Sequence, residues 1–281
     1  MNVFKQILNF YINSSIHVAL AVFSMAWITL MDFNLSYDAN VLYFIFYASI
    51  TGYNFVKFFG IAKFHHRSLT TWLKLIQIFS LICFILMCYY GVMLEESTML
   101  YIAGFGLITF LYAIPFLPTR FFRDEKNNLR SIAGLKVYLI ALVWSGVTVF
   151  LPLLNNTYHI NQDVLITGAQ RFLFVIILML PFEIRDLQFD SLKLATIPQK
   201  IGVKRTKIMG FVLGMLFFFL EFFKDDAQES QVESLLIITI ISILFVVFSK
   251  KGQGKYYCSF WVEGIPVLWL LLYLIVQGYF L

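Results

Sequence analysis

The residues best suited to chemistry lie in one polar stretch, 182–207, which reads FEIRDLQFDSLKLATIPQKIGVKRTK. Asp186 and Asp190 are four residues apart, so on a helix both carboxylates face the same way. Lys193 follows about one turn later. Paired carboxylates can hold Mg²⁺, which takes oxygen ligands and usually shares them with a substrate phosphate. The spacing therefore indicates a site for a metal-bound phosphate.

The residues after this pair add turn formers and bases. Thr196, Pro198 and Gly202 predict that the helix ends and that a loop follows. Lys204 and Arg205 lie beyond them and can bind phosphate oxygens directly. The alternative interpretation is a solvated interfacial loop whose acids only balance its bases.

The composition places these residues in a membrane protein. Of the 281 residues, 60% are hydrophobic and 13% are charged, and the mean hydropathy is +0.81. A soluble domain has about 25% charged residues. Apolar stretches of about 18 residues or more can cross a bilayer as helices, and their lack of alternation excludes a transmembrane barrel. The net charge of +5 comes from bases in short loops, so we expect no nucleic-acid partner.

The apolar runs predict an all-α membrane protein with nine transmembrane helices in a single domain, 1–281. The predicted spans are about 14–31, 40–61, 72–93, 99–118, 133–153, 164–183, 207–223, 234–249 and 258–279.

The loops between these spans differ in charge. One set holds 19 of the 21 lysines and arginines, while the alternate set carries mainly acids. Basic loops remain in the cytoplasm. We therefore expect an integral protein of a bacterial inner (cytoplasmic) membrane, with a cytoplasmic N-terminus and an external C-terminus. The long polar connections all fall on the cytoplasmic side, so a site would open there.

Six positions of the polar stretch stand in a recognisable order: Asp186, Asp190, Lys193, Thr196, Pro198 and Gly202. In this order they resemble the second Asp-rich motif of the UbiA-type intramembrane polyprenyltransferases, D-x-x-x-D followed by K, T, P and G. The span count, the orientation and the segment Tyr112–Pro115 are also similar. The resemblance implies a UbiA-like bundle with a lateral cavity open to the cytoplasm. It further implies that Asp186 and Asp190 bind Mg²⁺ and that the ligand is an isoprenoid diphosphate.

The sequence departs from the family at its first motif, N-D-x-x-D-x-x-x-D at the end of the second span. Asn54 is kept, but the three acid positions hold Phe55, Phe58 and Ala62. In the family these acids help to bind the Mg²⁺ that bridges to the diphosphate. Without metal, each carboxylate about 5 Å from a phosphate charge would cost roughly 3 kcal/mol at an effective dielectric of 20. The departure puts metal-dependent transfer in doubt.

Lys57 lies one turn beyond Asn54 and has three interpretations. It could replace a metal by pairing with Asp186 or Asp190, it could bind phosphate itself, or it could be an interfacial lysine that snorkels at a helix end. The predicted substrate-binding residues are Asn54, Lys57, Tyr112, Arg120, Lys193, Lys204 and Arg205.

Three further ionisable residues fall within apolar segments. Glu263 is a functional candidate because an intramembrane acid is expensive, although it could instead meet Lys255 or water. For Arg171 we expect a side chain that snorkels outward, and for His17 a packed, hydrogen-bonded ring rather than a ligand.

Three functions follow. The favoured one is a UbiA-like protein that keeps a head-group site for a membrane lipid or isoprenoid diphosphate, lacks normal metal-dependent transfer, and serves as a lipid-binding or membrane-complex subunit without a cofactor. The alternative is a divergent prenyltransferase that uses Mg²⁺. A small-molecule transporter is a weaker third hypothesis, because the sequence shows no persuasive repeat.

Overall fold

The computed structural model describes residues 3–62, 71–113, 134–189, 195–225 and 229–278, and these contain helices and no strand. The elements in chain order are α1 (Val3–Asn13), α2 (Ile16–Asp32), α3 (Ala39–Ala62), α4 (Thr71–Gly91), α5 (Glu96–Ala113), α6 (Leu135–Ser145), η3 (Gly146–Phe150), α7 (Leu151–Asn155), α8 (Gln162–Asp186), α9 (Ile197–Phe219), η5 (Leu220–Phe223), α10 (Glu229–Phe248), η6 (Tyr257–Val262) and α11 (Ile265–Val276). The predicted all-α class is confirmed.

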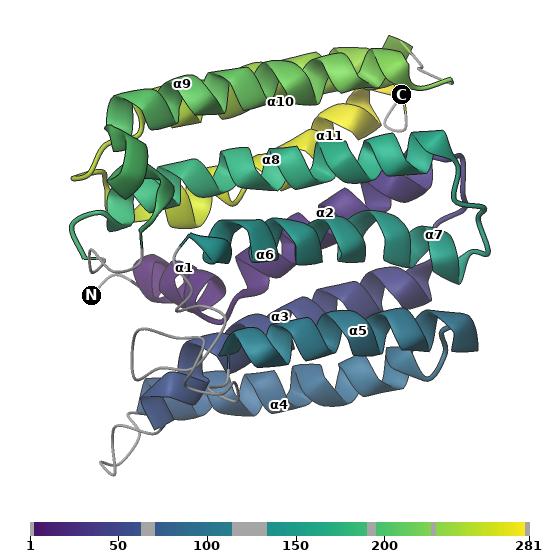
Figure 1. Cartoon of the computed structure of the whole chain (residues 1–281). Helices are drawn as coiled ribbons and strands as arrows, with labels where there is room; N and C mark the ends of the chain where they lie inside the picture. The colour runs from purple at the N-terminus through teal and green to yellow at the C-terminus, as the bar shows by residue number, and fades with distance from the viewer. Residues whose placement is uncertain (1–2, 63–70, 114–133, 190–194, 226–228, 279–281) are drawn as a thin grey trace, which may run out of the picture.

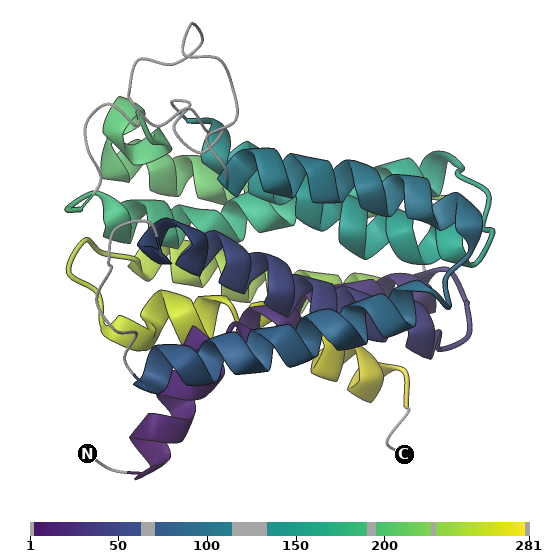
Figure 2. The ribbon, with the colours of Figure 1, turned by 90° about the horizontal axis from the view of Figure 1, so that it is seen from below.

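The long helices run side by side in one bundle (Figures 1 and 2). Helices α3, α4 and α5 form one edge, and α9 and α10 form the opposite edge (Figure 1). Helix α8 packs against α6, α9 and α10, while α2 joins the two sides through its contacts with α3 and α11. The largest apolar core lies between α2, α6, α8, α9, α10 and α11. Helices α2 and α8 thus carry polar residues into the middle of the molecule.

Each predicted span overlaps a helix or a run of joined helical elements, but nine membrane crossings are not confirmed. Within the described residues, six helical segments are long and apolar enough to cross a bilayer. The count reaches seven if α1 and α2, which are bent by 56° to each other, form one broken span. The nine crossings therefore stay a prediction.

The prediction for Thr196, Pro198 and Gly202 was wrong in part. These residues begin a helix: Gln199 Oε1 accepts a hydrogen bond from the Thr196 N–H at 2.9 Å, and Pro198 lies in the first turn of α9. Proline is accepted there because first-turn N–H groups need no partner within the helix. Gly202 then interrupts α9 with φ 81° and ψ 158°, a conformation that a side chain would strain. Regular helix resumes after it.

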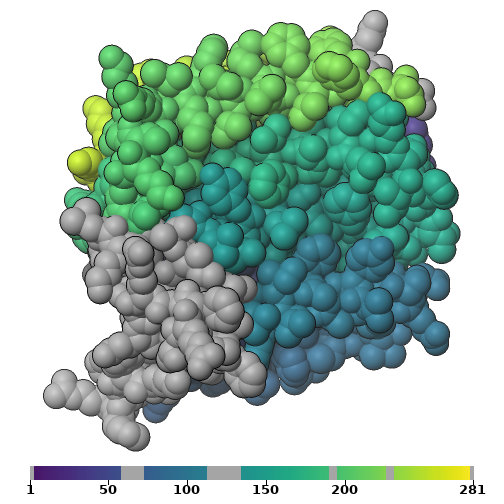
Figure 3. All heavy atoms as spheres, viewed as in Figure 1, coloured from purple at the N-terminus to yellow at the C-terminus, as the bar shows by residue number. Residues whose placement is uncertain are grey.

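The outer faces of the bundle are apolar, as a lipid environment requires. Only 11% of the α4 span is buried, against 67% of the α8 span. Figure 3 shows one such outer face, with α9 and α10 along one edge and α4 and α5 along the other. Exposed side chains on α4 and α9 include Ile78, Leu81, Ile85, Phe211, Val212 and Leu216. This exterior supports an integral membrane protein.

Two glycines allow α9 and α10 to pack closely. A Cβ at Gly210 would lie 2.7 Å from Val246 Cγ1, and one at Gly214 would lie 2.7 Å from Ile243. The pair is spaced as small-x-x-x-small, the pattern with which membrane helices bring their backbones together.

We expect Gly210→Ala and Gly214→Ala each to destabilise the protein by about 1–3 kcal/mol, because the added methyl overpacks the α9–α10 contact. Thermal unfolding in detergent measures this. Gly104→Ala is the control, since a Cβ there meets nothing within 4 Å. Equal midpoints for all three variants would contradict the prediction.

Candidate functional site

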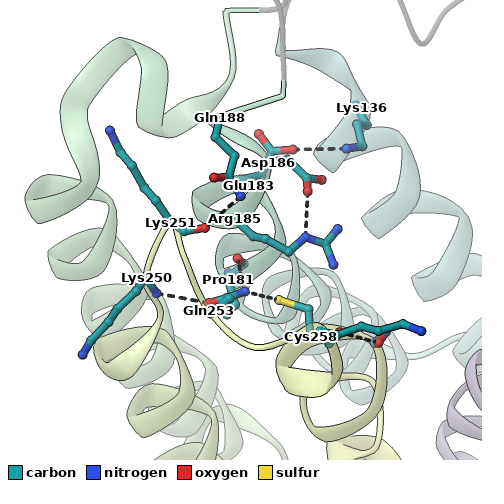
Figure 4. Close-up of polar contacts among 12 residues, drawn as sticks. Lys136, Pro181, Glu183, Arg185, Asp186, Gln188, Lys250, Lys251, Gln253 and Cys258 are labelled. Atoms are coloured by element: carbon teal, nitrogen blue, oxygen red, sulfur yellow. Dashed lines mark hydrogen bonds and ion pairs between the residues drawn. The ribbon is translucent and has the colours of Figure 1, made fainter. Parts of the chain in front are cut away.

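The end of α8 carries the acid that the sequence singled out. Helix α8 ends at Asp186, and residues 187–189 form a turn in which the Phe189 N–H donates to the Asp186 carbonyl at 2.8 Å. The expected helical continuation toward Asp190 is therefore wrong. Arg185 Nε donates to Asp186 Oδ1 at 2.7 Å, and its guanidinium lies 5.1 Å from the centre of the Phe182 ring (Figure 4). The first acid of the motif thus has a base as its neighbour in the chain.

A second carboxylate, which the sequence analysis missed, lies on the same helix. Glu183 is 1% exposed and forms an ion pair with Lys136, at the start of α6, with 3.5 Å between Nζ and Oε1 (Figure 4). Its spacing of three residues from Asp186 was the available signal. The pair ties α6 to α8 at this end of the bundle.

The other predicted metal-binding and substrate-binding residues near this end of α8 are either exposed on α9 or outside the described residues. Lys204 and Arg205 are exposed on α9, just beyond the interruption at Gly202. Asp190, Lys193 and Arg120 lie outside the described residues. The structure therefore tests neither the metal pair nor most of the predicted substrate-binding set, and these remain predictions.

Asn54 is a buried hub between three helices. Its Nδ2 donates to the Ser14 carbonyl at 3.0 Å and to Ser80 Oγ at 2.8 Å, while its Oδ1 accepts from Ser15 Oγ at 2.8 Å. These bonds join the α1–α2 joint, α3 and α4, and Asn54 is 2% exposed. The amide that the resemblance assigns to substrate binding is here engaged with the protein.

Lys57 lies beside this hub. Its Nζ donates to Ser15 Oγ at 2.8 Å, so Ser15 connects Lys57 with Asn54. The acid whose charge acts on Lys57 is Glu263 of the last span. Asp186 pairs instead with Arg185, and the described residues contain no ion pair between Lys57 and Asp186. The pairing of Lys57 with Asp186 thus finds no support among the described residues, and the pairing with Asp190, which lies outside them, stays a prediction.

Glu263 connects the two walls of the site. Its charge acts on Lys57 from α3 and on Arg185 from α8. Of the alternatives Lys255 and water, Lys255 bonds elsewhere, since its Nζ donates to Asn9 Oδ1 at 2.9 Å. Four ionisable side chains from three helical segments, Lys57, Arg185, Asp186 and Glu263, therefore form one electrostatic cluster, which we call the basic–acidic cluster.

Aromatic residues border this cluster. Trp144 Nε1 donates to the Tyr53 hydroxyl at 2.8 Å, the charge of Glu263 acts on Tyr53, and the Tyr53 and Tyr112 hydroxyls are electrostatically coupled. Tyr112, one of the predicted substrate-binding residues, therefore lies within electrostatic reach of Tyr53. Aromatic faces next to charged groups suit a ligand that joins an anionic head to an unsaturated chain.

The described residues of the cluster do not fit a Mg²⁺ site. Mg²⁺ needs several oxygen ligands in octahedral geometry. Asp186 and Glu183 each face a base, and Lys57 lies where the family carries acids. Within the described part of the chain, no three metal-ligating side chains come together. The described part of the donor set is therefore salt-bridged, and Asp190, the second predicted metal ligand, lies outside it.

Two other predictions concern residues elsewhere in the bundle. His17 packs as expected: its Nε2 lies 2.8 Å from the Phe260 carbonyl and its Nδ1 lies 2.8 Å from the Tyr11 hydroxyl. The outward snorkelling of Arg171 is wrong, because its side chain is 2% exposed and turns into the bundle. Arg171 contacts other side chains inside the bundle, and these contacts could not be inferred from the sequence.

The bundle has the architecture of UbiA-type membrane prenyltransferases, which confirms the predicted resemblance at the level of the fold. It matches a solved structure described as "Structural and mechanistic insights into the biosynthesis of Digeranylgeranylglyceryl phosphate synthase in membranes", with a TM-score of 0.57. The match covers 96% of this chain and 98% of the other at 15% identity. No family model and no curated protein matches the sequence.

We expect Asn54→Leu to lower the free energy of unfolding by about 2–4 kcal/mol, because it leaves buried hydrogen-bonding groups on three helices without their partner. Thermal unfolding of the purified protein provides the measurement. Asn13→Ala, on the exposed end of α1, is the control and should change little. A stable Asn54→Leu protein that fails only in ligand binding would contradict the structural role.

Proposed function

We propose that this protein binds the anionic head of a membrane lipid or isoprenoid diphosphate at the basic–acidic cluster and does not carry out normal metal-dependent prenyl transfer. It then acts as a lipid-binding protein or as a subunit of a membrane complex. The fold of a membrane prenyltransferase supports an isoprenoid-type ligand. The cluster supports recognition of the head group by protein cations.

The observation that carries this proposal is the position of Lys57. It occupies the segment in which the resemblance expects metal-binding acids, Ser15 holds it by a hydrogen bond, and the charge of Glu263 acts on it. A fixed ammonium binds phosphate oxygens without a bridging metal. When a diphosphate enters, it can compete with Glu263 for Lys57 and with Asp186 for Arg185. Binding is then an exchange of ion-pair partners, which keeps the buried charges compensated.

One observation favours the alternative, a divergent Mg²⁺-dependent prenyltransferase. Asp186 lies partly exposed at the end of α8, and the sequence keeps the D-x-x-x-D spacing to Asp190. In that case a metal would supply stabilisation of the leaving diphosphate. The protein would position Asp186 and Asp190 toward it.

The membrane setting follows the distribution of charge. We propose that the end of the bundle with Asp186 faces the cytoplasm of a bacterial inner membrane, that the N-terminus is on this side, and that the C-terminus is outside. Arg185 lies in the last turn of α8, and Lys204 and Lys207 lie in the first half of α9, which follows it in the chain. Basic residues at a cytoplasmic surface agree with the positive-inside rule.

We expect Lys57→Gln to weaken the binding of farnesyl or geranylgeranyl diphosphate about tenfold or more. A charge-assisted hydrogen bond contributes about 1.5–3 kcal/mol, and tenfold corresponds to about 1.4 kcal/mol. Radiolabelled diphosphate binding to detergent-purified protein gives the affinity. Lys207→Gln is the matched control, because Lys207 Nζ is bonded to the Val247 carbonyl on the outside of the bundle. Equal weakening by both variants would remove the proposed role of Lys57.

We also expect binding to persist in EDTA and no transfer product to form with Mg²⁺. The assay follows product formation from radiolabelled prenyl diphosphates of several lengths, with membrane extract as the source of acceptor. Metal-dependent turnover that is lost in Asp186→Ala would establish the alternative instead.

A further inference from the structure

The turn that carries Glu263 is irregular. Residues 257–262 form the π-helix η6, and the Glu263 N–H donates to the Cys258 carbonyl, five residues back, at 3.1 Å. Pro266, in the first turn of α11, has no N–H, so no regular helical bond runs from it to the preceding turn. Such π-segments are rare and frequently lie at functional sites. The position of Glu263 is therefore not fixed by its own helix alone.

His17, at the start of α2, contacts this turn on both sides of Glu263. Its Nε2 lies 2.8 Å from the Phe260 carbonyl oxygen, and the two rings are stacked with their centres 5.0 Å apart. The same carbonyl accepts from the Gly264 N–H at 2.9 Å, and a Cβ at Gly264 would lie 3.4 Å from His17 Nε2. His17 is buried. It therefore packs against the backbone three residues before Glu263 and one residue after it.

The partners of the His17 ring define the role of each nitrogen. A carbonyl oxygen can only accept, so Nε2 carries the proton and donates to Phe260. In the neutral ring Nδ1 then accepts from the Tyr11 hydroxyl of α1, which lies 2.8 Å away. Both nitrogens are thus bonded to the protein, which leaves neither of them for a metal or a phosphate. The contacts suit a residue that positions others.

The start of η6 is tied to α8, which carries Arg185. Gln253 Nε2 donates both to Cys258 Sγ and to the Pro181 carbonyl (Figure 4). The turn therefore has one anchor on α8 and a second anchor, His17, on α2. Because η6 is held from both sides, the loss of one anchor should let it shift.

We propose that His17 is a positioning residue of the head-group site and holds the turn that brings Glu263 to Lys57. Ser15 binds Lys57, and His17, two residues later, binds the turn of Glu263, so the start of α2 sets how these two charges lie relative to each other. This role rests on the proposed function, in which the anionic head competes with Glu263 for Lys57. His17 then determines how strongly Glu263 competes, and hence the affinity for the head group.

Hydrogen–deuterium exchange of the full-length protein in detergent tests the contact without a ligand. His17→Phe keeps a ring beside Phe260 but removes the N–H, so the amides of residues 257–264 should exchange about three- to tenfold faster, the effect of one hydrogen bond. His17→Asn, whose amide is too short to reach Phe260, should behave in the same way. His17→Gln offers an N–H at the reach of Nε2 and should restore slow exchange. His159→Phe is the matched control, since His159 is exposed in the loop before α8. Unchanged exchange in His17→Phe and His17→Asn would overturn the proposal.

A double-mutant cycle then links the turn to the site. Glu263→Gln removes the competing charge and should tighten the binding of farnesyl diphosphate about tenfold or more. In the His17→Phe background the same change should tighten binding only about threefold or less, because Glu263 is no longer held near Lys57. Equal gains in both backgrounds would mean that His17 stabilises the turn without positioning the charge, which would also overturn the proposal.

Failure of the proposed function has a different signature. Lys57→Gln would then bind farnesyl diphosphate as well as the wild type does, whatever the exchange of residues 257–264. That result would remove the site on which His17 acts. Weaker binding by Lys57→Gln together with equal gains in the cycle would overturn the role of His17 alone.

Discussion

A charged side chain within a bilayer needs a partner inside the protein, and this requirement organises the whole bundle. Uncompensated charge in lipid is expensive, whereas a paired and hydrogen-bonded charge is tolerated. Lys57 bonds to Ser15 within the field of Glu263, and Arg171 contacts Thr29 and Trp269. Each group links helices that are far apart in the sequence. The two ends of the molecule are therefore each fixed by a small set of polar contacts, with an apolar core between them.

This arrangement changes the meaning of the degenerate first motif. Replacing acids by Phe55, Phe58 and Ala62 removes negative charge from one wall of the site. Arg185 pairs with Asp186 and the charge of Glu263 acts on Lys57, so these four described charges sum to zero. The loss of the acids and the presence of Lys57 thus have the same effect, since both make this wall of the site less negative. A mutation that restored only the acids would leave Lys57 and the new carboxylates to pair with each other.

Much of the fold could be predicted because it follows from patterns that are local in the chain. Apolar runs located the helices, and the order of Asp186, Lys193 and Pro198 indicated the right architecture. The start of α9 was missed because Pro198 is compatible both with a helix end and with a first turn, and only the Gln199 contact with Thr196 decides between them. Local sequence could not choose between these two states.

The partners of the site residues were harder to predict, for a physical reason. Glu263 follows Lys57 by about two hundred residues, and only the packing of the last span against α3 and α8 brings their charges together. Arg171 was expected to reach water because a long side chain near a helix end commonly does so. The orientation of α8 turns it inward instead. Pairings of this kind depend on tertiary structure, which a single sequence does not reveal.

The joint between α1 and α2 has a mechanical consequence. Helix α1 has no buried residue and stands at 56° to α2, a geometry suited to a helix that lies along the membrane surface (Figure 2). Ser15, at the corner with φ 66°, is the residue that holds both Asn54 and Lys57. Any tilt that the bilayer imposes on α1 turns this corner and carries the lysine with it. The angle between α1 and α2 is thereby coupled to the position of Lys57 in the proposed head-group site.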